Sequence, residues 1–373
     1  MANYKQKIEG CLYLSSFLET LAFFNGKWEF NYGNKIDTIK EGILMNYFFI
    51  SHYNMMGGLN NIQFNTLKSS DDTILIMGTC DAILKGGSEK NYIDSYVKYL
   101  PLLKEEIRQS GRSTLSSLEK IRKTNSIKSI KYSSDHGGNG CAIRTAPIGL
   151  KYYENINKVC EEALIASLVT HNYTVGFLGG IITALFTAYA VKNISPFKWS
   201  IELEKLYKNK FFHVLIKKYI EKDIDNDIDT YFSYWQKYNE DRLSKMKFRN
   251  LPIFLNPAFK INDFTNYTSV PYLSKMSGYD KMGGSGLEGP IIAYDNLLLS
   301  AIPNNKMIVD IENPTFNWEI FLFNNVFFFG DNDSISAISA SWYGAYLGID
   351  KFPLEKIKEL EFYNELKNII NKF

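Results

Sequence analysis

Residues Gly330 to Gly348 read GDNDSISAISASWYGAYLG, and they bear more directly on the fold than any other stretch of the chain. Two aspartates one residue apart, Asp331 and Asp333, precede a run in which Ser, Ala and Gly recur on several faces of a helix. Small side chains let helices approach closely, because the distance between helix axes depends on the side chains at the contact. The stretch therefore predicts a tightly packed helix with two carboxylates at its start.

The GDNDSI motif admits three interpretations. In the simplest, Asp333 or Ser334 caps the following helix through a side-chain oxygen. In the second, an apolar strand ends in a DxD motif, as in haloacid dehalogenases, and Asp331 is a nucleophile that attacks phosphate. Only about forty residues follow, too few for the alternating strands and helices behind such a site. In the third, oxygens of Asp331, Asp333 and Ser334 bind a metal ion.

A second acidic cluster, SSDDTI, occupies residues 69–74. Its simplest interpretation is also a helix start, with Ser70 as the cap and Asp71 and Asp72 in a first turn that the helix dipole favours. Two oxygen-rich helix starts that faced each other would make a two-metal site, since Mg²⁺ takes about six oxygen ligands. The sequence leaves open whether they face each other.

Helical periodicity dominates the rest of the chain. Helices are expected from residue 73 to the Gly86–Gly87 stop, over 159–169, from Pro290 to residue 301, and as one amphipathic helix over 354–373. The aromatic stretch 316–329 fits a strand or a helix equally well. No linker composition marks a boundary. The prediction is an all-α fold: one compact multi-helix domain over 1–373, with a two-metal cleft and a variable polar insertion around 200–270.

Net charge, cysteine spacing and the apolar stretches of the chain exclude several classes of protein. The net charge of +2 gives no electrostatic bias toward nucleic acid or an anionic membrane. Four widely spaced cysteines form no zinc pattern and indicate reduced thiols in a cytosolic protein. The first ten residues show no signal peptide. The apolar stretch from Gly176 to Val191 is shorter than the roughly 20 residues that span a bilayer, so a buried helix is expected. We predict a cytoplasmic protein that binds neither membrane nor nucleic acid.

Three further stretches carry polar or glycine-rich features. HGGNGCAIR begins at His136 and KMGGSGLEGP begins at Lys281, and each precedes an expected helix. Glycines at such positions expose backbone N–H groups that can bind phosphate oxygens, although glycine-rich turns are common. FFNGKWEF combines a turn at Asn25–Gly26 with Glu29, which on its own would be an ordinary surface carboxylate.

In chain order, these motifs resemble the ADP-ribosylglycohydrolase family, and most closely its arginine-directed hydrolases. The matching stretches run from about Ile8 to Gly348: FFNGKWEF, SDDTILIMGTCDAIL, GGNGCAIRTAPIGL, GGIITALFTAYAV, PIIAYDNLLLSA and GDNDSISAISASWYGAYLG. The order and extent of these matches are far more specific than any single motif.

The resemblance implies an all-helical domain that holds two Mg²⁺ ions. The metal ligands it implies are Ser70, Asp71, Asp72, Asp331, Asp333 and Ser334. The catalytic residues it implies are Glu29, on a mobile first loop, with Asp71 and Asp72. The substrate-binding residues it implies are Gly137, Gly138, Asn139 and Gly140 for the diphosphate, Gly283, Gly284 and Ser285 for ADP-ribose, and also His171, Asn172, Ser116 and Ser117.

Several positions depart from the family pattern. Glu19 stands where the family has the aspartate of GDALG, and 172–176 read NYTVG in place of HHPTG. Residues 111–117 read GRSTLSS in place of GRAPGGA, so the later, substrate-contacting glycines of that family stretch are replaced here. Phe328, Phe329 and Ile335 replace polar or small residues beside the second acidic motif. None of these changes removes an implied metal ligand.

The activity implied is Mg²⁺-dependent hydrolysis of the N-glycosidic bond between ADP-ribose and an arginine side chain. Its partners would be ADP-ribosylated proteins and ADP-ribose, and the protein would act as a monomer. Two alternatives stay open: hydrolysis of another linkage such as ADP-ribosylserine, and a non-catalytic ADP-ribose-binding protein of the same fold.

Overall fold

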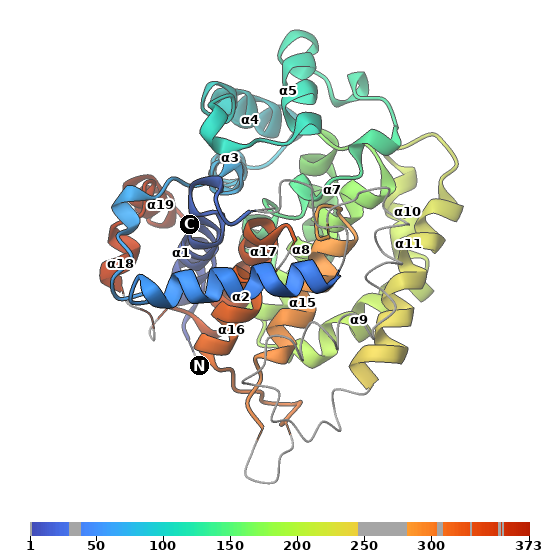
Figure 1. Ribbon diagram of the computed structural model, residues 1–373. Helices are drawn as coiled ribbons and strands as arrows, with labels where there is room; N and C mark the ends of the chain where they lie inside the picture. Colours follow the sequence, from blue (N-terminus) through green and yellow to red (C-terminus); the bar gives the residue numbers. More distant parts are fainter. Residues whose placement is uncertain are drawn as a thin grey trace.

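The computed structural model describes residues 2–29, 39–244, 282–303, 309–328, 330–349, 352 and 354–373, without the side chains of 39–46 and 241. Within these ranges the chain is helical, with two isolated β-bridges and no strand, which confirms the all-α prediction (Figure 1). The α-helices are α1 (Tyr4–Phe23), α2 (Ile39–Met55), α3 (Asp71–Leu84), α4 (Glu89–Leu103), α5 (Arg112–Thr124), α6 (Ala146–Tyr152), α7 (Ile156–Leu168), α8 (Thr174–Val191), α9 (Pro196–Lys208), α10 (Phe211–Lys217), α11 (Asp225–Tyr238), α15 (Glu288–Leu299), α16 (Trp318–Val326), α17 (Asn332–Leu347), α18 (Leu354–Lys358) and α19 (Tyr363–Ile370).

Helices α1 and α17 cross at two glycines. A Cβ on Gly10 would lie 2.6 Å from the carbonyl oxygen of Gly344, and a Cβ on Gly344 would lie 2.1 Å from the carbonyl carbon of Gly10. Further along, Ser15 donates to the carbonyl of Ala337 at 3.1 Å, so the two helices run antiparallel. The small residues of α17 therefore allow the close packing that the sequence predicted. The antiparallel contact also places the start of α17 beside the end of α1.

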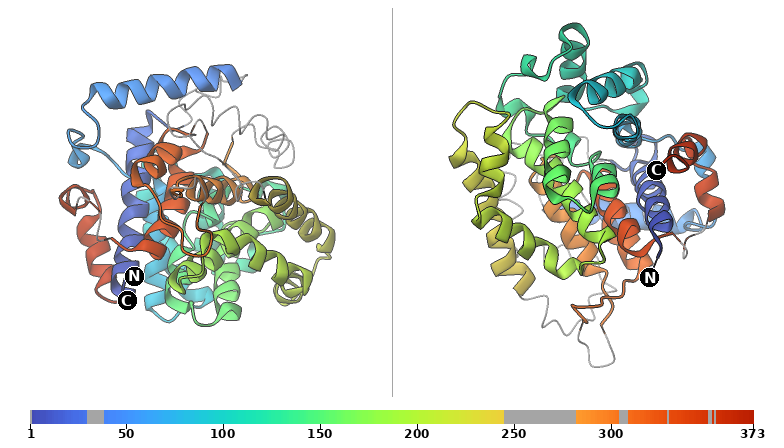
Figure 2. Two further views of the ribbon diagram at one scale, coloured as in Figure 1. Left: turned by 90° about the horizontal axis from the view of Figure 1, so that it is seen from below. Right: turned by 180° about the vertical axis from the view of Figure 1, so that it is seen from behind.

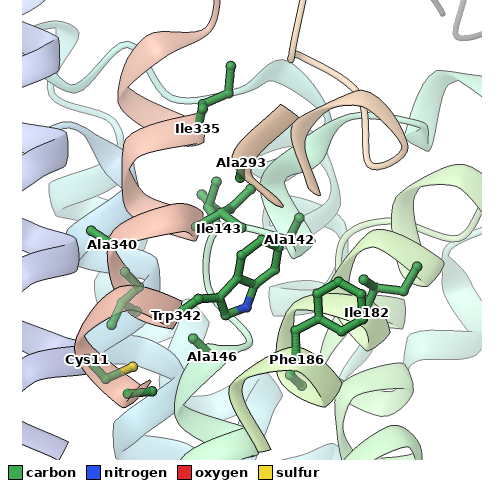
Figure 3. Close-up of a cluster of buried hydrophobic side chains, with 14 of the residues drawn as sticks. Cys11, Ala142, Ile143, Ala146, Ile182, Phe186, Ala293, Ile335, Ala340 and Trp342 are labelled. Atoms are coloured by element: carbon green, nitrogen blue, oxygen red, sulfur yellow. The ribbon is translucent and has the colours of Figure 1, made fainter. Parts of the chain in front are cut away.

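The core is built around α8, every residue of which is buried. Phe186 contacts the rings of Trp199 and Trp235, and also that of Trp342, beside which it lies in Figure 3. The indole N–H of Trp342 donates to the carbonyl of Thr183. Among the described residues, α8 alone has the length and composition of a membrane span, and its complete burial is what the central helix of a packed domain shows. The prediction of a buried helix here is confirmed. Figure 2 shows the same packed helices from below and from behind.

Three local predictions are resolved by the structure. The aromatic stretch near the second acidic motif forms helix α16, capped by the side chain of Asn317, and is not a strand. The expected single helix over 354–373 is wrong: α18 and α19 are separate, because the chain turns at residues 359–362. Capping of α17 by Asp333 or Ser334 is also wrong, because α17 begins at Asn332 and its cap residue, Asp331, makes no side-chain cap bond.

The polar region around 200–270 lies partly outside the described residues. Its described part forms α9, α10 and α11, of which α9 and α11 are packed into the aromatic core through Trp199, Trp235 and Tyr238. Whether this region varies as an insertion stays a prediction.

Candidate functional site

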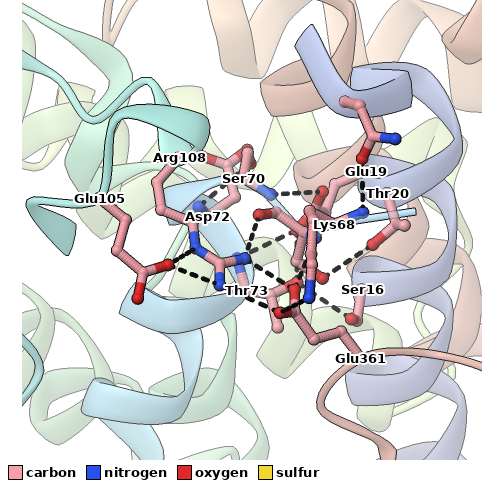
Figure 4. Close-up of polar contacts among 12 residues, drawn as sticks. Ser16, Glu19, Thr20, Lys68, Ser70, Asp72, Thr73, Glu105, Arg108 and Glu361 are labelled. Atoms are coloured by element: carbon pink, nitrogen blue, oxygen red, sulfur yellow. Dashed lines mark hydrogen bonds and ion pairs between the residues drawn. The ribbon is translucent and has the colours of Figure 1, made fainter. Parts of the chain in front are cut away.

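The C-terminal end of α1 holds the starts of both acid-bearing helices. The Glu19 carboxylate accepts the backbone N–H groups of Ser70 and Thr73, at 3.3 and 3.4 Å, and the Thr73 hydroxyl at 2.5 Å (Figure 4). On the other side of α1, the Asn332 side chain donates to the carbonyl of Ala22 at 3.1 Å. Because α1 touches both, the helix starts at residues 70 and 332 lie together although the sequence separates them widely.

Three carboxylates converge at this point. One oxygen each of Glu29, Asp331 and Asp333 lie within 4.8 Å of one another. Burial, followed by the charges of Glu29, Asp72 and Asp331, raises the pKa of Asp333 well above its ordinary value. The charges of Asp72, from the first motif, and of Asp331, from the second, both act on Asp333, so these carboxylates lie near one another. The two acidic motifs therefore face each other, the question that the sequence left open.

The first motif contributes Asp71 and Asp72 to the same acidic cluster. Burial and then the charges of Asp71, Glu19 and Asp331 raise the pKa of Asp72 well above its ordinary value. Burial raises the pKa of Asp71 to about 7, and the charge of Asp331 adds to this, whereas a bond from the Gly111 N–H opposes it. Ser70 caps α3 as predicted, with its hydroxyl oxygen accepting the N–H of Asp72 at 3.3 Å.

These residues fit a divalent cation. Oδ2 of Asp72 and Oδ1 of Asp331 are buried and have no hydrogen-bond partner within the described part of the chain. Buried carboxylates are costly unless a positive charge or hydrogen bonds compensate them. Carboxylate and hydroxyl oxygens are hard ligands of the kind that Mg²⁺ prefers. Asp72, Asp331, Asp333 and Glu29 would hold such an ion, with Ser70 and Ser334, both buried, beside them.

Two residues of this centre have functions that the sequence did not reveal. Glu29, predicted as a catalytic residue, lies among the potential metal ligands. Glu19, noted only as a departure from a family motif, is buried and holds α3 in place, and burial raises its pKa to about 8. A glutamate among the apolar residues of the C-terminal half of α1 was the available signal for Glu19.

The two glycine loops pair with each other beside the acidic cluster. Gly138 and Ser285 form an antiparallel bridge, and the Gly286 N–H donates to the carbonyl of Gly137 at 3.0 Å. The Asn139 side chain donates to Asp331 at 2.8 Å and to the carbonyl of Gly283 at 3.0 Å. The structure thus brings the predicted diphosphate loop, the second glycine loop and the metal motif into direct contact.

The remaining predicted substrate-binding residues differ in how far their polar groups are hydrogen-bonded within the protein. His171 is buried beside the first glycine loop. The Asn172 amide donates to the carbonyl of Ile130, and the Ser285 hydroxyl accepts the N–H of Glu288 at 3.0 Å. Ser117 donates to the carbonyl of Thr170, and the exposed Ser116 donates to the carbonyl of Ser113 on its own helix. The hydroxyl protons of Ser116 and Ser117 are thus already committed to backbone carbonyls.

Trp28 anchors the loop that carries Glu29. Its buried ring stacks on Phe24 with centroids 4.2 Å apart, and it contacts His52 of α2 and Phe327, just before the second acidic motif. At the start of the loop, Asn25 accepts the Lys68 N–H at 2.7 Å, two residues before Ser70. The loop is thus tied to both acidic motifs.

Replacement of Trp28 tests this anchor. Trp28→Ala should lower the free energy of unfolding by about 3 kcal/mol, because a buried Trp leaves a large cavity. The substitution should also weaken Mg²⁺ binding, because Glu29 loses its support. Trp28→Phe should retain most of the stability and most of the Mg²⁺ affinity. Urea unfolding and calorimetric Mg²⁺ titration measure these effects, and unchanged Mg²⁺ affinity in Trp28→Ala would separate the loop from the metal centre.

A buried ion pair fixes the segment that leads into α3. Arg108 donates to both carboxylate oxygens of Glu361, at 2.7 and 3.0 Å, and to the carbonyl of Ser69 at 2.8 Å (Figure 4). Glu361 also accepts the Ser69 N–H at 3.2 Å and the Lys68 amine at 2.8 Å. Burial alone would raise the pKa of Glu361, but the bonds from Arg108 and Lys68 outweigh it and lower that pKa.

Loss of this ion pair should cost stability. Glu361→Gln should lower the free energy of unfolding by about 2 kcal/mol at pH 7, since hydrogen bonds to charged groups contribute about 1.5–3 kcal/mol. The loss should shrink as pH falls below about 4.3, where the unfolded glutamate takes up a proton, because a lowered folded pKa stabilises only above that range. Glu355→Gln is the control, since its exposed pair with Lys358 should contribute almost nothing. Equal losses of stability in Glu361→Gln and Glu355→Gln would contradict the stabilising role of the ion pair between Arg108 and Glu361.

Together, the fold and the cluster place the chain in the class of all-helical proteins with an acidic, cation-competent centre beside paired glycine loops. The model of the ADP-ribosylglycohydrolase family matches residues 1–373, and the chain belongs to this family. The family is metal-dependent and hydrolyses linkages to ADP-ribose.

Two curated relatives and one solved structure illustrate this membership. The "Putative ADP-ribosyl glycohydrolase L444" of Acanthamoeba polyphaga mimivirus is 30% identical over 96% of this chain and 68% of its own length. The ADP-ribosylhydrolase ARH1 of Dictyostelium discoideum is 28% identical over 98% of this chain and 93% of its own length. The structure of an ADP-ribosylglycohydrolase-related protein complex is similar in fold, with a TM-score of 0.52 at 14% identity, over 99% of this chain and 96% of that one.

Proposed function

We propose that this protein is a Mg²⁺-dependent hydrolase that removes ADP-ribose from arginine side chains of proteins. The observation that carries the proposal is the convergence of Glu29, Asp331 and Asp333, together with the charge effects that link Asp72 to Asp331 and Asp333. Family membership supports hydrolysis of an ADP-ribose linkage, and the acidic cluster supports a bound cation, whereas the number of two ions rests on the family resemblance. The choice of arginine rests on FFNGKWEF, the loop that carries Glu29, which resembles the arginine-directed members of the family.

In the proposed reaction, water attacks the anomeric carbon of the distal ribose, and the bond from that carbon to the arginine nitrogen breaks. The bonding electron pair stays on the guanidine nitrogen, which takes up a proton, and the products are ADP-ribose and free arginine. The transition state resembles an oxocarbenium ion, as in other glycoside hydrolyses. When bound, Mg²⁺ would polarise the water and offset the charge of the carboxylates.

The protein's own groups have distinct roles in this scheme. Asp71, half-buried, bonded by the Gly111 N–H and influenced by the positive charge of Arg144, accepts the proton of the attacking water. Asp72 and Asp333 would hold the cation, and they place negative charge near the developing oxocarbenium. Glu29 orients the ribose at the cluster. The paired loops around Gly138 and Ser285 bind the diphosphate through backbone N–H groups.

Peptides that carry ADP-ribose on a defined residue test the proposal. The protein is incubated with an ADP-ribosylarginine peptide and an ADP-ribosylserine peptide, with and without Mg²⁺, and mass spectrometry follows the loss of ADP-ribose. Release from arginine only, and only with Mg²⁺, is expected. Faster release from serine would reassign the linkage. ADP-ribose binding without release from either peptide would identify a non-catalytic binding protein.

A further inference from the structure

His171 has one ring nitrogen bonded and the other directed at the first glycine loop. The ring is 2% exposed, and Nδ1 lies 2.7 Å from the hydroxyl oxygen of Thr170. A Cβ built on Gly138 would lie 3.4 Å from Nε2, and one built on Gly140 would lie 3.2 Å from it. No hydrogen bond to Nε2 is formed by any residue that the structure describes. The Nε2 edge therefore faces the loop assigned to the diphosphate.

A buried arginine holds both the glycine loop and the neighbour of His171. Arg144 is fully buried, and its guanidinium donates to the carbonyl of Gly140 at 2.8 Å and to the hydroxyl oxygen of Thr170 at 2.7 Å. Its other donors reach the carbonyl of Ala166 and the hydroxyl of Tyr96, at 3.0 and 3.1 Å. One rigid, planar cation thus fixes the loop and the hydroxyl group at the same time.

These hydrogen bonds determine the direction of the Thr170 hydroxyl proton and which ring nitrogen of His171 is protonated. A guanidinium can only donate, so the hydroxyl oxygen of Thr170 accepts from Arg144. The proton of that hydroxyl then needs an acceptor, and Nδ1 of His171 is at hydrogen-bond distance. The Cys141 sulfur, also near this hydroxyl, is only a weak acceptor. An imidazole that accepts at Nδ1 carries its proton on Nε2.

The ring stays neutral in this setting. Burial, followed by the positive charge of Arg144 and the neighbouring His136, lowers the pKa of His171 well below its ordinary value. A neutral imidazole has one donor and one acceptor, and which nitrogen donates is set by the bond that the other makes. A second buried cation next to Arg144 is thereby avoided.

We propose that Arg144 and Thr170 are positioning residues that fix His171 as its Nε2–H tautomer, so that this N–H donates to a diphosphate oxygen of ADP-ribose on the Gly137–Gly140 loop. The identity of the ligand rests on the proposed function, whereas the tautomer is a property of the free protein. Arg144 acts twice, because its bond to the carbonyl of Gly140 also fixes the loop beside the same oxygens.

Nitrogen-15 NMR of the full-length protein reads the tautomer directly. The chain has four histidines, so the His171 signals are assigned by their loss in His171→Asn. In the wild-type protein Nε2 should be protonated, and Thr170→Ser, which keeps a hydroxyl, should leave that pattern unchanged. Thr170→Val should shift the proton toward Nδ1 or give a mixture. Protonation at Nδ1 in the wild-type protein, or an unchanged pattern in Thr170→Val, would overturn the proposal.

Calorimetric binding of ADP-ribose supplies the second readout. Thr170→Val and His171→Asn should weaken binding at least about tenfold, as expected for loss of one hydrogen bond to a charged group. Thr170→Ser should stay within about threefold, as should His171→Gln, whose amide can donate near the Nε2 position. Thermal unfolding confirms that each variant is folded. Equal weakening by the serine and valine variants would contradict the assigned bond.

The two experiments separate this proposal from the proposed function. A wild-type protein that shows no ADP-ribose binding would overturn the proposed function and the ligand assigned to His171 together. A protein that binds ADP-ribose but carries the His171 proton on Nδ1 would overturn only the positioning roles of Arg144 and Thr170.

Discussion

Asp71→Asn and Asp333→Asn should each lower kcat/KM for an ADP-ribosylarginine peptide by at least about a thousandfold, which corresponds to about 4 kcal/mol of transition-state stabilisation. Asp71 is the proposed acceptor of the water proton, and Asp333 lies within the three-carboxylate cluster. An amide has the same shape as the carboxylate but can neither take up a proton nor supply the charge that holds a cation. Rates of ADP-ribose release measure the effect.

Asp81→Asn provides a matched control for these variants. Asp81 lies on the same helix as Asp71 but pairs with Lys98 at the surface, outside the acidic cluster. Its replacement should leave kcat/KM within about twofold, because exposed ion pairs contribute little. Well-folded Asp71→Asn or Asp333→Asn protein with near-normal activity would remove those residues from the mechanism.

Chelation of Mg²⁺ should lower activity at least about a hundredfold and should also make the protein easier to unfold. Readdition of Mg²⁺ at one hundred times its dissociation constant should stabilise the protein by about 2.7 kcal/mol, by mass action alone. In the chelated state, Asp333→Asn should be at least as stable as the wild type, because it removes one of several carboxylates that repel one another.

Thermal unfolding of both proteins, chelated and with Mg²⁺, tests this pattern. The wild type should gain stability with Mg²⁺, and Asp333→Asn should gain little. Stability and activity that do not respond to chelation would contradict a cation at the cluster. A strongly destabilised Asp333→Asn protein in the absence of metal would show that the carboxylate serves the fold, rather than an ion.

The fold class could be predicted from the sequence because local periodicity and small residues report directly on helices and their packing. The SDDT helix with its Ser70 cap begins where the sequence places it. The 316–329 stretch could not be assigned, because short aromatic runs fit a strand or a helix, and tertiary packing decides between them. The break between α18 and α19 contains Glu361, which contacts Arg108 far away in the sequence, and no local pattern shows such a contact.

The acidic site was predictable in its residue types but not in its geometry. Carboxylate spacing and family resemblance identify both motifs, but neither shows that the end of α1 joins them. The role of Glu19 follows from its bonds to Ser70 and Thr73 across helices, which no local pattern encodes. The roles of Arg144 and Thr170 follow in the same way from contacts made only in the folded chain.

The most direct test of the central claim is the number of Mn²⁺ ions bound at equilibrium, measured by electron paramagnetic resonance on chelated wild type, Asp72→Asn and Asp333→Asn. Mn²⁺ takes the same hard oxygen ligands as Mg²⁺ and reports its own free concentration. Because both motifs surround the same ions, each substitution alone should abolish or greatly weaken binding. Wild-type stoichiometry and affinity in either variant would show that the two motifs do not share a metal centre.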